Sequence, residues 1–230
     1  MKDFTLLEKN LDIYFENKGL LQQAFIHRSY INEQAGSGLA HNERLEFLGD
    51  AVMELIVTDY LFEHFPKNPE GELTAYRASL VNTITISDTA RELGFDEFLI
   101  LSKGESRDTG KARAYILANT YEAFIGALYL DQGYDAARSF VHTTLIKKLD
   151  YIIQHGLWRD AKSYVQEKSQ EIESVTPSYR VIHQVGPDHD KIFTVGIYFG
   201  DKLIAEGKGS SKQEAETDAA RNALEVRGWN

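Results

Sequence analysis

Cysteine is absent from this chain of 230 residues, which excludes disulfide bonds, thiolate metal ligands and a cysteine nucleophile. No apolar run approaches the roughly 18 residues that a membrane span requires. The first residues, MKDF, do not resemble the start of a signal peptide. We therefore expect a cytoplasmic protein with no membrane partner.

The chain has no excess of basic residues either. It contains 25 Lys and Arg residues and 35 Asp and Glu residues, so its net charge is −10. This balance excludes a uniformly basic nucleic-acid wrapper, although it allows a local basic surface. Proline is scarce, with four residues in all. The residues that are present, 43% hydrophobic and 11% aromatic, predict a globular protein with ordinary cores.

Helical spacing of apolar residues dominates the chain up to about residue 155. Within this part, we expect the segment 96–110 to be a polar connection that either holds phosphate or is simply solvated. The predicted helices cover roughly residues 3–16, 18–33, 42–64, 70–93, 111–131 and 133–154.

The pattern changes after Gly156. A helical run from Asp160 to Glu173 is followed by Pro177, which we expect to act as a stop. A final helix begins at a capping box formed by Ser211 and Glu214. Between the two helices lie three strand-like segments, residues 179–185, 191–199 and 202–207.

The small residues of the final helix share one face that suits close packing on a sheet: Ala215, Ala219, Ala220, Ala223 and Leu224. The sequence thus predicts an all-α domain over residues 1–155. An α+β domain in the order α-β-β-β-α follows over residues 156–230.

Four acidic residues of the predicted helix 42–64 fall within about 80° of one another: Glu43, Glu46, Asp50 and Glu54. On the opposite side we expect core residues: Leu45, Leu48, Val52 and Leu55. Carboxylates at this spacing repel one another unless water or a cation screens them, and they offer hard oxygen ligands that suit magnesium. A solvated helix face is the alternative, and spacing alone favours it.

Asn119 and Glu122 are neighbours one turn apart in the otherwise apolar helix 111–131. Polar side chains on a largely buried helix need partners. A metal shared with Glu46 and Asp50, a helix-end contact, or a salt bridge with Arg44 or Arg77 would each supply one. Spacing alone favours the alternatives to the metal.

Residues 42–51, with the sequence NERLEFLGDA, closely resemble the signature stretch of the ribonuclease III family. The resemblance continues in order through residues 27–29, 70–72, 77–78, 103–105 and 118–131. The second domain resembles a double-stranded RNA-binding domain at residues 166–167, 186–189 and 207–212. Together these motifs cover most of the chain.

The resemblance implies that four side chains surround divalent magnesium, for which manganese could substitute: Glu46, Asp50, Asn119 and Glu122. Asp50 and Glu122 are the leading catalytic residues. Glu43 and Glu70 match further acidic positions of the family, with supporting roles in RNA engagement or product release. Glu54 has no counterpart and is expected to be a surface residue, while His27 and Arg28 are expected to serve the fold or an interface.

The resemblance also implies a homodimeric, magnesium-dependent endoribonuclease that cuts double-stranded RNA to 5′-phosphate and 3′-hydroxyl ends and processes ribosomal and other structured RNA precursors. Four residues of the second domain are the candidates for RNA contact: Gln166, Glu167, His189 and Lys212. Residues 158–230 hold 10 basic and 12 acidic side chains, so −2 of the net charge of −10 lies there. A few placed contacts suffice, because duplex RNA is recognised mainly by shape.

Two positions depart from the family pattern. Asn119 stands where the family typically has aspartate, which removes one negative charge from the metal site. Gln213 follows Lys212 where a second lysine is common, so one phosphate contact is lost. The departure at Asn119 supports one alternative function, a regulator that binds double-stranded RNA but cleaves it poorly.

Overall fold

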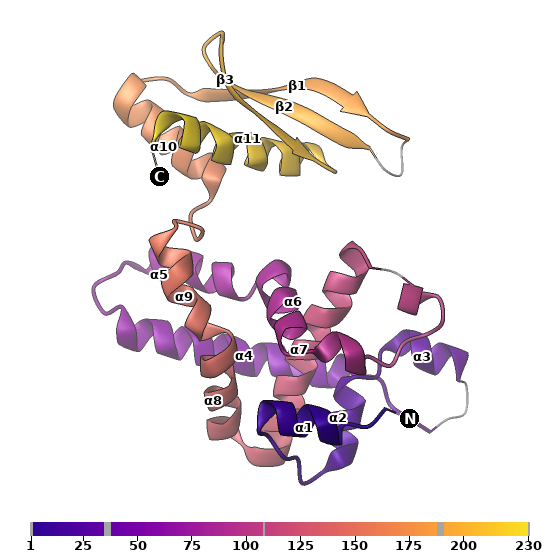
Figure 1. Cartoon of the computed structure of the whole chain (residues 1–230). Coiled ribbons are helices and arrows are strands. Elements are labelled where there is room, and N and C mark those ends of the chain that lie inside the picture. Colours follow the sequence, from indigo (N-terminus) through magenta and orange to yellow (C-terminus); the bar gives the residue numbers. More distant parts are fainter. Residues whose placement is uncertain (1, 35–37, 108, 188–190, 230) are drawn as a thin grey trace. The chain divides into compact units, whose positions relative to one another are not determined.

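The computed structural model describes residues 2–34, 38–107, 109–187 and 191–229. The chain divides into two compact units, residues 1–153 and 154–230 (Figure 1). The first unit is helical and the second has the order α-β-β-β-α, so the predicted fold class is confirmed. No helix in the described ranges is both long enough and apolar enough to cross a membrane.

The first unit is a bundle whose two longest helices pack against each other over the largest interface of the unit. These are α4 (Glu43–His64) and α7 (Lys111–Gln132). The shorter helices surround this pair: α1 (Thr5–Leu11), α2 (Lys18–Ala24), α3 (Arg28–Glu33), α5 (Glu70–Leu80), α6 (Thr83–Glu92), α8 (Tyr134–Thr144) and α9 (Leu149–Gln154).

A cluster of buried aromatic rings fills the core next to α7. Phe124 lies 5.1 Å from Phe95 and 4.9 Å from Phe140, measured between ring centroids. Phe25 lies 5.0 Å from Phe95. These rings come from α7, α8 and the segments that follow α2 and α6, so the core fixes α7 from several sides.

Two of the predicted helices are each divided in the structure at a side-chain cap. The segment 18–33 breaks after Ala24, where Ile26 pairs with Ile100 and the His27 side chain accepts a hydrogen bond from the Ser29 N–H to cap α3. The segment 70–93 breaks after Leu80, where the Asn82 side chain caps α6. Both errors have one cause, because apolar spacing continues across a local cap that ends one helix and begins the next.

The remaining boundaries differ in smaller ways. The segment 3–16 is helical only over α1, and between α8 and α9 the chain forms the 3₁₀ turn η3 (Ile146–Lys148). The segment 96–110 is not polar throughout, because Phe98 of the 3₁₀ turn η1 (Phe95–Phe98) and the following Leu99 are buried. Its polar part contains the short turn η2 (Glu105–Arg107).

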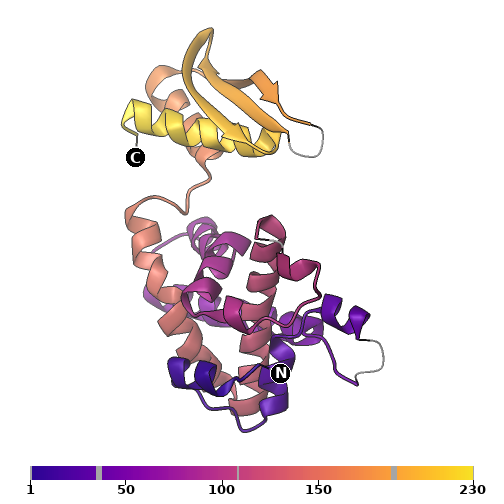
Figure 2. The same cartoon turned by 45° about the vertical axis from the view of Figure 1, so that its right-hand side comes forward.

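The second unit packs two helices on one face of an antiparallel sheet, as both views show (Figures 1 and 2). Its elements are α10 (Ala161–Glu173), β1 (Pro177–Val185), β2 (Ile192–Phe199), β3 (Lys202–Gly209) and α11 (Lys212–Arg227). Helix α10 ends before Pro177, at Ser174 in a left-handed conformation, and Pro177 begins β1. The predicted stop therefore lies four residues beyond the helix end.

Close packing in this unit follows the prediction for the final helix. Ala215, Ala219 and Ala223 are fully buried, and a Cβ added at Gly207 of β3 would lie 2.0 Å from the Ala219 nitrogen. The Ser211 hydroxyl accepts a hydrogen bond from the Glu214 N–H at 3.1 Å. Glu214 in turn accepts from the Ser210 N–H at 2.9 Å, so its reciprocal bond reaches one residue before the cap.

Candidate active site and RNA-binding surface

Two glycines bring the backbones of α4 and α7 into contact. A Cβ added at Gly49 would lie 1.8 Å from the Glu122 carbonyl oxygen, and one added at Gly126 would lie 2.2 Å from the Leu45 carbonyl oxygen. Neither position has room for a side chain of any size. The crossing point of the two helices is therefore fixed, and the acidic side chains lie beside it.

Glu46, Asp50 and Glu122 form an acidic cluster at this crossing. Burial raises the pKa of Glu122 to about 8, with further contributions from Asp50 and Glu46. Burial also raises the pKa of Glu46, to which Glu43 and Asp50 add, whereas the side-chain amide of Asn119 lowers it. A raised carboxylate pKa with these causes marks a place where negative charge is confined.

Arg44 and Arg77 were the alternative partners considered for Asn119 and Glu122, and each of them lies against other residues. Arg77 contacts Glu54 at 3.7 Å and donates a hydrogen bond to the Thr58 hydroxyl at 3.1 Å. Arg44 lines a pocket beside Phe47. Glu54 is therefore a half-exposed residue that pairs with Arg77. It does not belong to the acidic cluster, to which α4 contributes Glu46 and Asp50.

The donor set of the cluster suits a hard divalent cation. The three carboxylates and the Asn119 carbonyl offer hard oxygen atoms, and a cation would relieve the repulsion by Asp50 and Glu46 that adds to burial in raising the pKa of Glu122. Within the part of the chain that the structure describes, no group of three or more acidic or histidine side chains already has the arrangement of a metal site.

Glu43 adjoins the cluster, because its charge adds to the raised pKa of Glu46, whereas Glu70 begins a separate helix. Glu43 begins α4 and contacts the Arg28 guanidinium at 3.2 Å and the His41 ring at 3.7 Å. Glu70 begins α5, which runs back along α4 with Arg77 beside Glu54. At about 1.5 Å per residue, Glu70 lies roughly 20 Å along α4 from Glu46. One chain therefore does not bring Glu70 to the cluster.

His27 makes contacts within the fold, whereas Arg28 is exposed and contacts Glu43. The His27 N–H donates to the Ile100 carbonyl at 3.1 Å, and its ring lies 2.8 Å from the Ser29 hydroxyl. Ser29 in turn accepts from the Ser102 N–H at 3.1 Å. This network ties α3 to the segment that leads into α7.

The expectation that Leu48 and Leu55 are core residues is wrong. Leu55 is 58% exposed and Leu48 is partly exposed, while the buried side of α4 includes Leu45, Val52 and Met53. The close approach at Gly49 turns α4 so that a second apolar stripe faces outward. On this stripe Phe47 is 81% exposed, next to a pocket of about 750 Å³ whose lining includes Leu20, Leu48 and Leu130.

In the second unit, three of the four RNA-binding candidates lie within the described residues and all three are exposed. Gln166 and Glu167 lie on α10, opposite its buried residues Ala161 and Val165. Lys212 is the first residue of α11. His189 lies outside the described residues. Gln213 is also exposed, beside Lys212.

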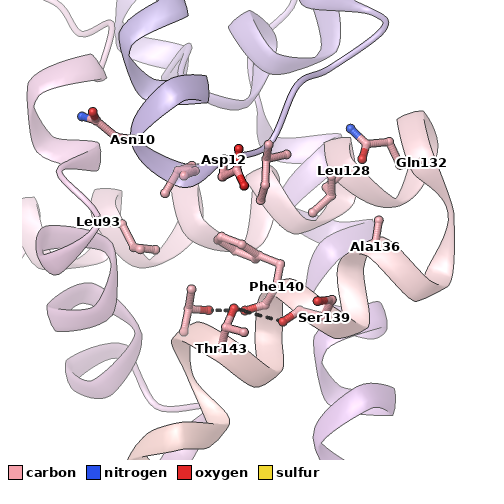
Figure 3. A pocket seen from close by; sticks show the side chains of 12 residues that line it. Asn10, Asp12, Leu93, Leu128, Gln132, Ala136, Ser139, Phe140 and Thr143 are labelled. Atoms are coloured by element: carbon pink, nitrogen blue, oxygen red, sulfur yellow. Dashed lines mark hydrogen bonds between the residues drawn. The ribbon is translucent and has the colours of Figure 1, made fainter.

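A pocket of about 420 Å³ lies among α1, α7 and α8, where α7 contributes its C-terminal part rather than the acidic cluster (Figure 3). Phe140 and Leu128 line it together with Asn10 and Asp12 from the end of α1, as Figure 3 shows. Thr143 on its wall donates its hydroxyl to the Ser139 carbonyl at 3.0 Å. We assign this pocket no role.

Sequence reasoning missed Gly49, Gly126 and Phe47. A glycine inside each of two long helices is the signal that was available for the first two, because glycine weakens a helix unless a neighbour must approach closely. Phe47 had no such signal, since one apolar side chain on α4 does not reveal which side the partner helix covers.

Each of the two units matches a known protein family. Residues 17–149 match the family model described as ribonuclease-III-like, and residues 161–227 match the double-stranded RNA binding motif. The nuclease domain of ribonuclease III from Campylobacter jejuni is a structural relative with 38% identity and a TM-score of 0.57. It matches 63% of this chain and 97% of its own.

Full-length relatives are similar over both units. Ribonuclease 3 from Enterococcus faecalis is 44% identical over 221 residues, which cover 96% of this chain and 95% of the relative. Ribonuclease 3 from Borreliella burgdorferi is 42% identical over 218 residues, covering 95% of this chain and 89% of the relative. The resemblance seen in the sequence is thereby confirmed, and the chain belongs to the ribonuclease III family.

Proposed function

We propose that this protein is a magnesium-dependent endoribonuclease that cleaves double-stranded RNA to 5′-phosphate and 3′-hydroxyl ends. The observation that carries the proposal is the acidic cluster at the glycine crossing of α4 and α7, in a chain that also has a double-stranded RNA binding motif. Processing of ribosomal and other structured RNA precursors in the cytoplasm is the corresponding task.

Glu46, Asp50, Asn119 and Glu122 are the residues that would hold magnesium, and manganese is a possible substitute. Magnesium bound there would supply Lewis-acid stabilisation of the phosphate and activation of water. Asp50 is the most exposed carboxylate of the cluster. Glu122 is the most confined, and Glu46 and Asp50 are close enough to raise its pKa. Removing its charge therefore changes cation binding most directly.

Glu43 supports RNA engagement from the start of α4, where Arg28 and His41 hold its carboxylate. Gln166, Glu167, His189 and Lys212 contact the duplex through the second unit, where Lys212 supplies a phosphate contact. Shape recognition through such contacts explains how an acidic protein binds a polyanion.

A homodimer is part of the proposal. Phe47 is exposed beside an apolar pocket on the same surface. In a two-fold symmetric pair, each copy would insert its Phe47 into the pocket of the other copy. Two cuts in a duplex need two sites, and a second copy would supply the second. It would also provide a Glu70 for each site, which one chain keeps roughly 20 Å from Glu46.

The test is cleavage of a long RNA duplex by wild-type protein and by Glu122→Gln, each with magnesium and then with chelator. We expect the variant to lose cleavage by at least about 100-fold while it keeps duplex affinity, since it loses a ligand charge but little volume. Glu54→Gln is the matched control. Near-normal cleavage by Glu122→Gln would contradict the catalytic assignment, and a silent wild type that still binds duplex would favour the regulator.

A further inference from the structure

Arg159 lies just before α10 and stacks on two aromatic rings. Its guanidinium carbon lies 4.3 Å from the centroid of the Tyr164 ring and 5.0 Å from that of the Trp158 ring. The backbone is held on both sides, because the Arg159 N–H donates to the Gly156 carbonyl at 3.1 Å and the side chain of Asp160 caps α10. Arg159 is nevertheless exposed. Its guanidinium group is therefore confined to one place while it stays open to solvent.

The charge of Arg159 is also not neutralised by an acidic partner. Among the residues that the structure describes, Arg180 and Arg227 stack on rings as well, and each contacts a carboxylate, Asp201 at 3.6 Å and Glu173 at 3.0 Å. Within the same described ranges, no such ion pair reaches Arg159. A positive charge that is ordered but unpaired is suited to bind an anion.

The position of Arg159 connects it to the proposed RNA-binding surface. Tyr164 and Glu167 are three residues apart on α10, so their side chains are neighbours on the helix surface. Glu167 is exposed and is one of the residues proposed to contact the duplex. Because phosphates border the minor groove of a duplex, a cation stacked on Tyr164 lies where the RNA backbone can reach it when α10 contacts the groove.

We propose that Arg159 binds a phosphate of the RNA backbone, and that Trp158 and Tyr164 hold its guanidinium group in the binding position. The inference rests on the proposed function, because it adds a contact to the same duplex-binding surface. Arginine suits this task, because its planar fork donates two hydrogen bonds to one phosphate, whereas lysine offers a point charge. Since the group is already stacked, less side-chain freedom is lost when the phosphate binds.

Arg159→Ala in the full-length protein is the direct probe. Fluorescence anisotropy with a labelled RNA duplex measures the affinity over a salt series, in buffer with chelator so that the RNA stays intact. We expect the affinity to fall about fivefold and the slope of log K against log salt to fall by about one. Arg221→Ala is the matched control, because it removes the same charge from an exposed residue further along α11 than Lys212. It is expected to match wild type.

Two further variants test the role of the rings. Arg159→Lys keeps the charge, so the slope is expected to stay at the wild-type value while the affinity falls about threefold. Trp158→Leu is expected to weaken binding of the wild-type protein but not of Arg159→Ala, because the ring acts through the guanidinium group.

Three outcomes would overturn the inference: an unchanged slope in Arg159→Ala, an equal loss in Arg221→Ala, or an equal effect of Trp158→Leu in both backgrounds. Thermal unfolding detects a purely structural role, in which Arg159→Ala unfolds at a lower temperature but keeps the wild-type affinity and slope. Duplex cleavage is measured separately. A wild type that binds duplex RNA through Arg159 but never cleaves it would contradict the proposed function alone.

Discussion

Glu122 is the residue at which burial and like charge combine most strongly. Burial, Asp50 and Glu46 raise its pKa to about 8 in the folded protein, from the ordinary value of 4.5. The folded state therefore binds more protons than the unfolded state between these values. The contribution of Glu122 to the free energy of unfolding is greatest below about pH 4.5 and is lost as the pH rises through about 8.

The first prediction follows for Glu122→Gln in the presence of chelator. At pH 8 we expect this variant to unfold about 5 °C or more above wild type, and near pH 4.5 we expect the two proteins to coincide. Glu54→Gln serves as control, because its half-exposed carboxylate contacts Arg77 and its loss costs at most about 1 kcal/mol. Thermal unfolding measured at the two pH values tests this prediction. A difference in unfolding temperature between variant and wild type that does not grow with pH would contradict the raised pKa of Glu122.

Lys212 offers a second prediction at this scale. It is exposed at the first position of α11, where its charge can reach a phosphate. We expect Lys212→Ala to weaken duplex binding about equally for all sequences and to lower the slope of log K against log salt by about one. Fluorescence anisotropy over a salt series measures the slope. An unchanged slope would show that Lys212 makes no phosphate contact.

At the scale of elements, the crossing of α4 and α7 is the feature on which the acidic cluster depends. We expect Gly49→Ala to destabilise the protein by about 3 kcal/mol or more, because its methyl group would lie 1.8 Å from the Glu122 carbonyl oxygen. Gly71→Ala, with nothing within 4 Å of the added carbon, is the matched control and should be neutral or stabilising. Urea unfolding measures both, and equal stabilities would mean that the helices can separate.

The boundaries of the elements show how far the sequence determines the fold. Apolar periodicity predicted the long helices 42–64 and 111–131 nearly to their observed ends, because each lies between clear end signals. It did not predict the breaks at Ile26 and Asn82. There a backbone pairing across the chain and a side-chain cap decide the conformation, and neither changes the spacing of apolar residues.

The same limit applies to the candidate site. Family motifs selected Glu46, Asp50, Asn119 and Glu122, and helical spacing explained why pairs of them share a face. The spacing of residues along one helix does not determine the angle at which that helix crosses another. For this reason the exposed Leu55 was assigned to the core.

At the scale of the whole molecule, the exposed stripe of α4 leads to a prediction about assembly. Phe47 is 81% exposed beside a pocket lined by Leu20, Leu48 and Leu130, and a contiguous exposed apolar patch of this kind is typical of a protein–protein interface. We expect Phe47→Asp to shift the protein from dimer to monomer in sedimentation analysis and to keep its helical content. Phe62→Asp, at 74% exposure and about four turns further along α4, tests whether the interface extends along the helix. A Phe47→Asp protein that remains dimeric would place the interface elsewhere.

The division of the chain into two compact units leads to the last prediction. Each unit has its own core: the aromatic cluster around Phe124 in the first, and the packing of Val165 and Ile197 with the alanines of α11 in the second. Removing residues 157–230 should therefore leave a folded first unit with the proposed dimer surface of α4 intact. We expect this fragment to bind duplex RNA at least about 10-fold more weakly, because the double-stranded RNA binding motif at residues 161–227 is lost.

Circular dichroism, sedimentation and duplex-binding titrations on the full chain and the fragment measure these three properties separately. Residual cleavage by the fragment at high RNA concentration is expected, because the acidic cluster lies wholly within α4 and α7. A fragment that unfolds would show that the first core depends on the second unit. A fragment that binds duplex as tightly as the full chain would transfer the main RNA contacts to the first unit, where Arg28 beside Glu43 would be the first residue to test.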